Sequence, residues 1–445
     1  MRLGRSRLLA VGAASALMVA ACSGGQPTTA PGGSGPAGSG PAGSGPAGSG
    51  PAGSGGQIGG TVSVIGTWGG DEETAFLDMV APFEEQTGVD VQYTGTRDLE
   101  AVLTTGVASG ILPDVAGLPG PGQMRQFATN GDIVDLGTVL DRATYEAETA
   151  PTFVELGTVD GMLAGVFIKS AVKGPIWYNV ANFTGEPPAT FEDLQALPAD
   201  PAEQKWCVAL EGGADSGWPG TDWIEDIVLR QSGPEVYDQW VAGEVAWTSP
   251  EIRSAFETFG QVLENSYGGP DYINATPFGQ GGNQLFADPP GCLFHHQASF
   301  ITSFFMNEGG ATADQYDFFL FPEIDPEYAG ALTGAGDLFG MFTDTPQSRA
   351  LIQYLVTPEA QQIWVDIGGA ISGNLMVTEY PDEISQRLAE ALADAETFRF
   401  DAGDQMPGEM NTAFFAAMVE FAADQSALDS ILANLDTVQT SAYEE

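Results

Sequence analysis

The sequence predicts an α/β fold built as two domains, and three observations support this. A strand–helix–strand pattern opens the body of the chain between residues 61 and 93, which is typical of parallel sheets. A second series of strand and helix patterns begins near residues 175–179. The chain has 445 residues, so even after a leader ending at residue 56 it is long enough for two well-developed cores.

The first strand and helix are predicted from periodicity. Residues 61–65 alternate apolar and polar side chains, as a half-buried strand does. Apolar side chains then recur at helical spacing between Phe76 and Phe83, with Asp71 as the expected N-cap and Gly88 as the stop. The elements expected next are a strand at 89–93, a helix at 99–109 and a strand entered at 113–116.

Helical patterns dominate the later part of the chain. Four apolar residues between Ile252 and Leu263 form one stripe, which predicts a helix over this range. The other elements expected here are a strand at 318–322, helical segments at 348–367 and 384–392, and a helical pair at 412–435.

The N-terminal segment has the pattern of an export signal. Arginines at positions 2, 5 and 7 precede an uncharged run from Leu8 to Ala21, too short and wrongly flanked to be a spanning helix. The tetrad Val19-Ala20-Ala21-Cys22 resembles the lipobox of bacterial lipoproteins, which implies cleavage before Cys22 and acylation of its sulfur and new amino group. The alternative is a plain secretion signal with a free thiol at this position.

Behind the cysteine, four copies of Pro-Ala-Gly-Ser-Gly extend from Pro36 to Gly55. These residues carry no side chains that could build a core, so we expect an extended leash. We therefore interpret residues 1–21 as a signal peptide and 22–56 as the lipidated cysteine and linker. The protein would then be anchored to the bacterial cell membrane by its N-terminal lipid and work outside the cytoplasm.

The charge of the chain excludes several partners. Sixty acidic residues face 14 basic ones, for a net charge of −46. Such a surface repels phosphate backbones and anionic lipid, so we expect no nucleic acid as partner. We attribute the acidity to solubility, with an acidic recognition patch as the alternative.

The remaining cysteines and histidines do not suggest catalysis. In an oxidising compartment the pair Cys207 and Cys292 favours a structural disulfide. The only histidines, His295 and His296, are adjacent and lack a spaced third ligand for zinc. No serine lies in a Gly-x-Ser-x-Gly elbow and no lysine follows a glycine, so the hydrolase elbow and the phosphate-binding loop are absent. We expect neither a metal nor a cofactor.

Several motifs occur in an order that resembles one family. They lie at residues 64–73, 83–89, 113–115, 131–136, 217–226, 292–300 and 398–407. Between residues 61 and 421 the chain is similar to the extracellular solute-binding proteins of sugar ABC importers, most of all the α-glucoside-binding branch of the maltose-binding superfamily. The resemblance implies a two-lobed type II periplasmic-binding-protein fold with hinge crossings and a cleft that closes on a carbohydrate.

The resemblance also implies an organisation and a set of partners. Residues 57–170 with 326–376 would form lobe 1, and residues 171–325 with 377–445 would form lobe 2. The protein would be a monomer that delivers a sugar, in this branch an α-glucoside, to the membrane permease subunits of an importer, without being an enzyme. The alternatives are a lipid-anchored glycoside hydrolase, because carboxylates and aromatic rings serve both functions, and a surface adhesion module.

Four candidate sugar ligands fall in the expected first lobe. Trp68 follows the first strand, where ligands of α/β sheets bind, and is either a stacking platform or a core residue. Glu72 is either a hydroxyl ligand or a charge that favours the helix start. Asp114 resembles the family position that reaches the sugar, and Asp337 is expected on a glycine-rich loop that allows close approach of a ligand.

The other candidates fall in the expected second lobe. Trp218, Asp222 and Trp223 crowd one helix start, although Trp223 is also a candidate for the core. His296 and Gln297 follow an apolar strand and either point into the cleft or are buried and satisfied. The resemblance adds Phe415, at a position where the superfamily tends to place an aromatic residue.

Overall fold

Two β-sheets organise the computed structural model, which describes residues 57–444. The large sheet has the strand order β12-β11-β3-β1-β2, with β6 also paired to β11, and the small sheet has the order β10-β7-β9-β8. The large sheet comprises β1 (Thr61–Gly66), β2 (Asp90–Gly95), β3 (Val115–Leu118), β6 (Val166–Val172), β11 (Leu332–Met341) and β12 (Phe398–Phe400). The small sheet comprises β7 (Ile176–Asn179), β8 (Gln204–Cys207), β9 (Cys292–His296) and β10 (Tyr316–Phe319). A separate hairpin joins β4 (Thr158–Val159) to β5 (Met162–Leu163).

We call the large sheet and the helices packed on it lobe 1. Strand β1 pairs in parallel with both β2 and β3, as the opening pattern predicts, whereas β11 runs antiparallel to β3 and β6. The helices that precede β6 or follow β11 around this sheet are α1 (Asp71–Thr87), α2 (Leu99–Ser109), α3 (Pro121–Asn130), α4 (Arg142–Glu148), α5 (Pro151–Leu156), α11 (Pro346–Leu355) and α12 (Pro358–Ile367), with the short η1 (Leu136–Thr138).

Helix α1 illustrates how the sequence sets the local structure. Its apolar stripe from Phe76 to Phe83 is buried, and Gly88 ends the helix in the left-handed conformation at φ 69°. The expected capping role of Asp71 is wrong: Gly70 occupies the N-cap position and Asp71 is the first helical residue, where its charge faces the positive end of the helix dipole.

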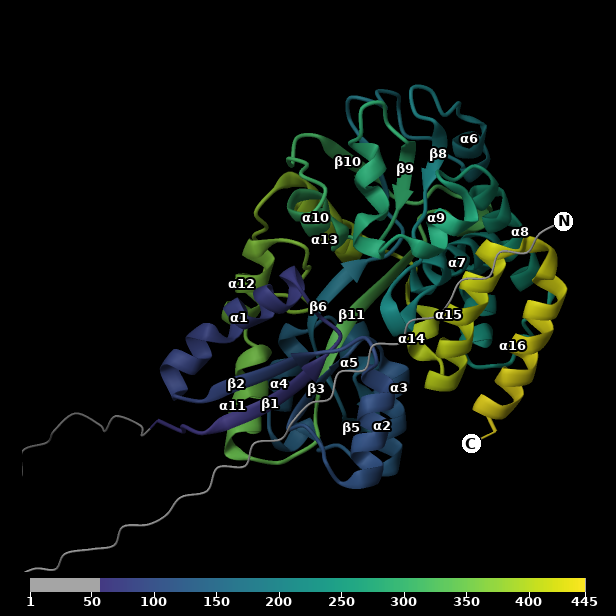
Figure 1. Cartoon of the computed structure of the whole chain (residues 1–445). Helices are drawn as coiled ribbons and strands as arrows, with labels where there is room; N and C mark the ends of the chain where they lie inside the picture. Colours follow the sequence, from purple (N-terminus) through teal and green to yellow (C-terminus); the bar gives the residue numbers. More distant parts are fainter. Residues whose placement is uncertain (1–56, 445) are drawn as a thin grey trace, which may run out of the picture. The chain divides into compact units, whose positions relative to one another are not determined.

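We call the small sheet and its helices lobe 2. These helices are α6 (Phe191–Ala196), α7 (Trp218–Val241), α8 (Pro250–Glu264), α9 (Gly269–Ala275), α10 (Ile301–Asn307), α15 (Gly408–Ala423) and α16 (Leu428–Ala442), with η2 (Gly213–Asp215), η3 (Phe278–Leu285), η4 (Pro326–Tyr328) and η5 (Gln425–Ala427). The stripe from Ile252 to Leu263 is buried on α8, and the helical pair predicted near the C-terminus is α15 and α16. Figure 1 shows this pair, in yellow, beside α7 and α8.

Two further predictions need comment. The segment predicted as helical at 348–367 is two helices, because Pro358 starts a new helix that Thr357 caps. Cys207, the last residue of β8, and Cys292, the first residue of β9, form a disulfide with their Cα atoms 5.4 Å apart. In the described part of the chain, no helix is long and apolar enough to cross a membrane.

The chain passes between the lobes where β6 leads to β7 and where β10 leads to β11. Figure 1 shows β6 and β11 running from the large sheet toward the small one. Helices α13 (Glu383–Asp394) and α14 (Ala402–Gln405) flank β12 in the sequence. Strand β12 pairs with β11, so residues 398–400 belong to lobe 1, although they fall in the range expected for lobe 2. The predicted lobe boundaries otherwise stay a proposal.

Candidate functional site

An open cavity of about 180 Å³ is lined by residues of both lobes. Lobe 1 contributes the residues after β1, the first turns of α1 and α2, and the strands β6 and β11. Lobe 2 contributes η2, the first turn of α7, η3 and α15. The lining contains carboxyl groups (Glu72, Glu100, Asp215, Asp222, Asp337, Asp401 and Asp404), cations (Arg97, Lys169 and Lys173) and half-buried aromatic rings (Trp218, Phe278, Phe300 and Phe415).

Two lysines line the cavity, one within strand β6 and one directly after it. Lys169 lies inside β6, and Lys173 follows Val172, the last residue of that strand. The ammonium nitrogen of Lys169 lies 2.5 Å from Glu72 Oε1 and 3.7 Å from Asp337 Oδ2. Burial lowers the pKa of Lys169, but the two carboxylates outweigh burial and raise this pKa above its usual value. Lys169 therefore holds Glu72 and Asp337 in fixed orientations.

Lys173 forms a second unit of the same kind. Its ammonium nitrogen lies 2.7 Å from Asp222 Oδ1, 2.8 Å from Asp401 Oδ2 and 5.1 Å from the centre of the Trp218 ring. Here too, burial lowers the pKa of Lys173, and the neighbouring carboxylates raise it well above its usual value. The two lysines thus orient carboxylates from α1, β11, α7 and the start of α14 around one space.

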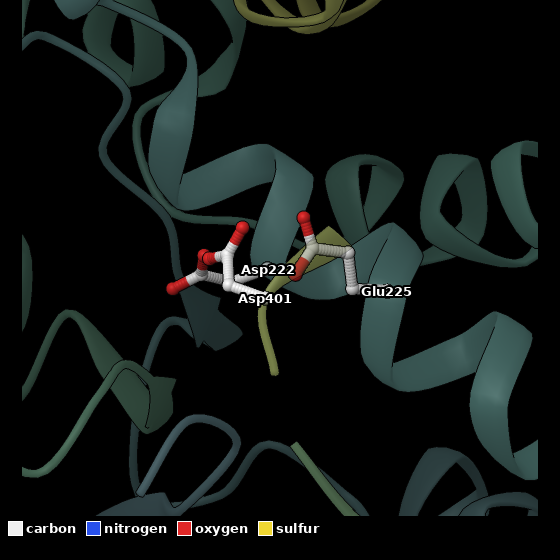
Figure 2. Close-up of side chains that lie close together, drawn as sticks. All are labelled: Asp222, Glu225 and Asp401. Carbon is white, nitrogen blue, oxygen red and sulfur yellow. The ribbon is translucent and has the colours of Figure 1, made fainter. Parts of the chain in front are cut away.

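The second unit includes the one cluster in the described residues with spacing suited to a metal ion. Asp222, Glu225 and Asp401 each offer an oxygen, and these oxygens lie within 4.8 Å of one another (Figure 2). Because Lys173 bonds two of the three, its ammonium already supplies the positive charge that a metal would bring. One oxygen of Asp222 and one of Glu225 are buried without a hydrogen-bond partner.

Burial and crowding change the protonation of these acids. Burial raises the pKa of Asp222 to about 7, against the effect of Lys173, and burial raises the pKa of Asp337 and of Asp215 to about 6. Burial together with the neighbouring carboxylates also raises the pKa of Glu225 and of Asp404 well above the usual range. Several of these groups hence bind protons more tightly in the folded than in the unfolded chain.

We expect the protein to become more stable when the pH falls from 8.0 to 6.5. A carboxyl whose pKa is raised on folding contributes stability that is complete below its unfolded pKa and is lost as the pH rises through its folded pKa. Asp222, with a pKa of about 7, titrates inside this window. The buried histidines act in the opposite direction, because burial lowers the pKa of His295 to about 4 and also lowers the pKa of His296, but that loss is concentrated below pH 6.5.

Urea unfolding at the two pH values measures this effect, and a larger free energy of unfolding is expected at pH 6.5. Asp404→Asn should flatten the dependence, because it removes one of the crowded carboxyls, while the exposed Asp78→Asn should leave it unchanged. Equal stability at pH 8.0 and 6.5 would show that the crowded acids do not carry protons in this range.

The aromatic rings of the cavity come mainly from lobe 2. Trp218 has its ring centre 5.1 Å from that of Phe278 and 6.0 Å from that of Phe300. Phe415 lines the same space from α15. From lobe 1, the guanidinium of Arg97 lies over Phe278 at 5.1 Å from the ring centre. The cavity thus combines oriented oxygen acceptors with apolar ring surfaces.

Six of the ten predicted ligand-binding residues line this cavity: Trp68, Glu72, Trp218, Asp222, Asp337 and Phe415. Two of these six differ from the expectation. Asp337 lies inside strand β11 and not on a loop. Trp68 is only 3 % exposed, because it packs among Phe76, Phe339 and Trp364, so its ring is a core residue with an edge at the cavity and not a stacking platform.

The other four predicted residues do not line the cavity. Asp114 accepts hydrogen bonds of 2.9 Å from the backbone N–H and the hydroxyl of Ser63, which join β1 to the start of β3. Trp223 is 1 % exposed and packs between Trp206 and His296 in the core of lobe 2. The side chain of Asp114 therefore links two strands and that of Trp223 packs in the core, and neither contacts the cavity as expected.

His296 and Gln297 are likewise buried, which matches the alternative considered for them. The Nε2 atom of His296 lies 2.7 Å from Asp226 Oδ2. The side-chain oxygen of Gln297 accepts from the backbone N–H of Ala298, and its carbonyl accepts from the indole of Trp177. Cys22, the predicted lipidation site, lies outside the described residues.

Sequence reasoning did not identify several cavity residues, namely Arg97, Glu100, Lys169, Lys173, Asp215, Phe278, Phe300, Asp401 and Asp404. One signal was available for the lysines: the chain has only three, and two of them lie four residues apart in an apolar segment that is otherwise typical of a buried strand. Such lysines need buried partners, which makes the segment a candidate for a site.

The fold and the cavity together define a class. Two α/β lobes with a polar and aromatic cavity between them are the arrangement found in binding proteins of the periplasmic type. The family model described as "Bacterial extracellular solute-binding protein" matches residues 78–393, and this chain belongs to that family.

Curated relatives and solved structures agree with this assignment. The osmoprotective compounds-binding protein GgtB of Synechocystis sp. is 37 % identical over 372 residues, which cover 81 % of this chain and 88 % of that protein. The alpha-glucosides-binding periplasmic protein AglE of Rhizobium meliloti is 36 % identical over 391 residues, covering 83 % and 85 %. A chitin oligosaccharide binding protein has the same fold, with a TM-score of 0.75, 17 % identity and coverage of 86 % and 99 %.

Proposed function

We propose that this protein captures a sugar or oligosaccharide outside the cytoplasm and delivers it to the membrane permease of an ABC importer. An α-glucoside is the favoured ligand, supported by the likeness to the alpha-glucosides-binding relative. The observation that carries the proposal is the cavity between the lobes, where carboxylates held by Lys169 and Lys173 face the rings of Trp218 and Phe415.

This lining suits the chemistry of a sugar. Hydroxyl groups donate to carboxylate oxygens, and the C–H faces of a pyranose pack on aromatic rings. Lys169 donates a hydrogen bond to one oxygen of Glu72, and Lys173 donates one to an oxygen of Asp222. These bonds fix both carboxylates before a ligand binds. Preorganised acceptors lower the entropic cost of binding.

The cavity residues also support closure of the lobes on the ligand. Glu100 of α2 accepts a 3.4 Å hydrogen bond from the hydroxyl of Thr412 on α15, and Arg97 of lobe 1 lies over Phe278 of lobe 2. A ligand that contacts both lobes favours the closed arrangement by its extra contacts there. We infer a binding role without catalysis, since capture and release by hinge motion need no reacting group.

The location of the protein at the cell membrane is also part of the proposal. A lipid on Cys22 and a leash through residue 56 would keep a monomeric receptor near its permease, raising its local concentration there. Mass spectrometry of the protein isolated from its native membrane tests this directly. A diacylated or triacylated N-terminal cysteine is expected, and an unmodified Cys22 would contradict the anchor.

Thermal unfolding of the mature protein with a panel of sugars tests the function. Trehalose, maltose, sucrose and α-glucosylglycerol represent α-glucosides, and cellobiose and xylobiose are the controls. A ligand at 100 times its Kd should add about 2.7 kcal/mol to the free energy of unfolding. Chromatography of the same mixtures should show each sugar intact. Unchanged melting with every sugar would argue against the proposal, and release of glucose would favour the hydrolase alternative.

A further inference from the structure

The two lysines of the cavity are already engaged by carboxylates. Lys169 is shared by Glu72 and Asp337, and Lys173 is shared by Asp222 and Asp401. Arg97 covers the Phe278 ring, and its nearest carboxylate oxygen, on Glu72, is 4.0 Å away. A ligand that carries a negative charge would therefore find no free ammonium group on the floor of the cavity.

Three acids of the cavity, in contrast to the lysines, form no ion pair with a described residue. Within residues 57–444, no ion pair joins Glu100, Asp215 or Asp404 to a basic side chain. Each of the three is half-buried and lines the cavity. In addition, Asp222 is 1 % exposed and keeps one oxygen without a partner. Taken together, the lining has seven carboxyl groups and three cations.

The three unpaired acids surround the space from different elements. Glu100 comes from α2 in lobe 1, Asp215 from η2 in lobe 2, and Asp404 from α14 between β12 and α15. Closure on a ligand would bring any added negative charge near all of them while water is removed. Burial raises the pKa of Asp215 to about 6, so at pH 8.0 this carboxyl is ionised. Its repulsion of another negative charge strengthens as the surroundings become less polar.

We propose that the cavity selects uncharged or cationic glycosides and rejects glycosides that bear a carboxylate, with Glu100, Asp215 and Asp404 as the residues that impose this selection. The inference rests on the proposed function and narrows its substrate class. A neutral sugar uses the free carboxyl oxygens as hydroxyl acceptors, and an ammonium group would be attracted to them. A carboxylate on the ligand can neither donate a hydrogen bond to these oxygens nor be attracted to them.

Two matched sets of probes test the selection. The first is α,α-trehalose with its 6-amino-6-deoxy derivative and its 6-carboxylate, which differ at a single carbon. The second is α-glucosylglycerol with α-glucosylglycerate, in which a carboxylate replaces a primary alcohol. Calorimetric titration at pH 8.0 gives the ratio of Kd values within each set. The carboxylate should bind at least about 100-fold more weakly than the neutral glycoside of its set.

Variants assign the selection to residues. In the triple variant Glu100→Gln, Asp215→Asn and Asp404→Asn, the ratio of carboxylate to neutral Kd should fall at least 10-fold. The matched control, Asp78→Asn, Asp271→Asn and Glu308→Gln, makes the same change in net charge at exposed positions outside the cavity and should keep the wild-type ratio. A variant that binds all glycosides more weakly keeps the same ratio of carboxylate to neutral Kd, so a general loss of affinity cannot be mistaken for a loss of selection.

The outcomes separate this inference from the proposed function. If neutral glycosides bind and the carboxylates bind equally well, the inference is wrong and the function stands. If the ratio is large but the same in both triple variants, the selection comes from the overall charge and not from the three named acids. If no neutral glycoside of either set or of the sugar panel binds, the proposed function fails and the inference fails with it.

Discussion

Replacing Asp226 by alanine should lower the free energy of unfolding by about 3–5 kcal/mol, the cost typical of removing one partner from a buried ion pair. Oδ1 of Asp226 lies 2.5 Å from the guanidinium of Arg230, and Oδ2 lies 2.7 Å from Nε2 of His296. The hydroxyl of Thr333 also donates to Oδ1. Burial alone would raise the pKa of Asp226, but Arg230 and His296 hold it below the usual value, so this carboxylate is ionised in the folded protein.

The large effect follows from what the substitution leaves behind. Arg230 is 2 % exposed and lies over the Phe321 ring, so its charge would stay buried without a counter-ion. Asp226 also joins α7 of lobe 2 to Thr333 on β11 of lobe 1. Its loss therefore weakens the region where the lobes are connected as well as the core of lobe 2.

Urea unfolding followed by circular dichroism measures this loss, and Asp429→Ala is the matched control. Asp429 pairs with Arg253 at 2.7 Å, but the two side chains are 87 % and 34 % exposed. An exposed pair of this kind contributes at most about 1 kcal/mol. Equal stability of Asp226→Ala and Asp429→Ala would contradict the structural role assigned to the buried network.

Replacing Trp218 by leucine should weaken binding of the best neutral glycoside at least about 30-fold, which corresponds to a side chain that dominates an interface. Trp218 is the cavity tryptophan with an accessible ring, half-buried at the first position of α7 and set against Phe278 and Phe300. Leucine keeps apolar volume but removes the flat surface on which a pyranose packs. This expectation rests on the proposed function.

Calorimetric titration with the glycoside that gives the largest thermal shift measures the change. Phe183→Leu is the control, because Phe183 is also half-buried in lobe 2 but packs against Tyr178 and Phe294 away from the cavity. The control should bind like the wild type. Equal affinities for Trp218→Leu and the wild type would remove Trp218 from the site.

Periodicity predicted most of the elements because it reports burial within one element. The stripe on α8 and the strand–helix–strand unit around α1 depend on contacts whose spacing is written in a few adjacent residues. The division of residues 348–367 into two helices shows the limit of this reasoning. Apolar spacing continues through the break, while Thr357 and Pro358 start a new helix.

The site was predicted less completely, since each candidate was judged from its neighbours in sequence. Asp114 and Trp223 stand in polar or aromatic contexts that suit a ligand, yet their partners are Ser63, 51 residues earlier, and Trp206, 17 residues earlier. Asp401 was in a recognised motif, but its role depends on Lys173. Contacts between distant segments decide such roles, and local patterns do not encode them.

The sequence by itself determined the α/β class, the order of elements, the family resemblance, the acidic charge and the pairable cysteines, because each depends on composition or on local spacing. Only the tertiary structure decided which acids face one another across the cavity, which tryptophan presents its ring and which cations are already neutralised. Burial and distance set the strength of charge interactions, and both arise only when β6 lies between carboxylates from separate parts of the chain.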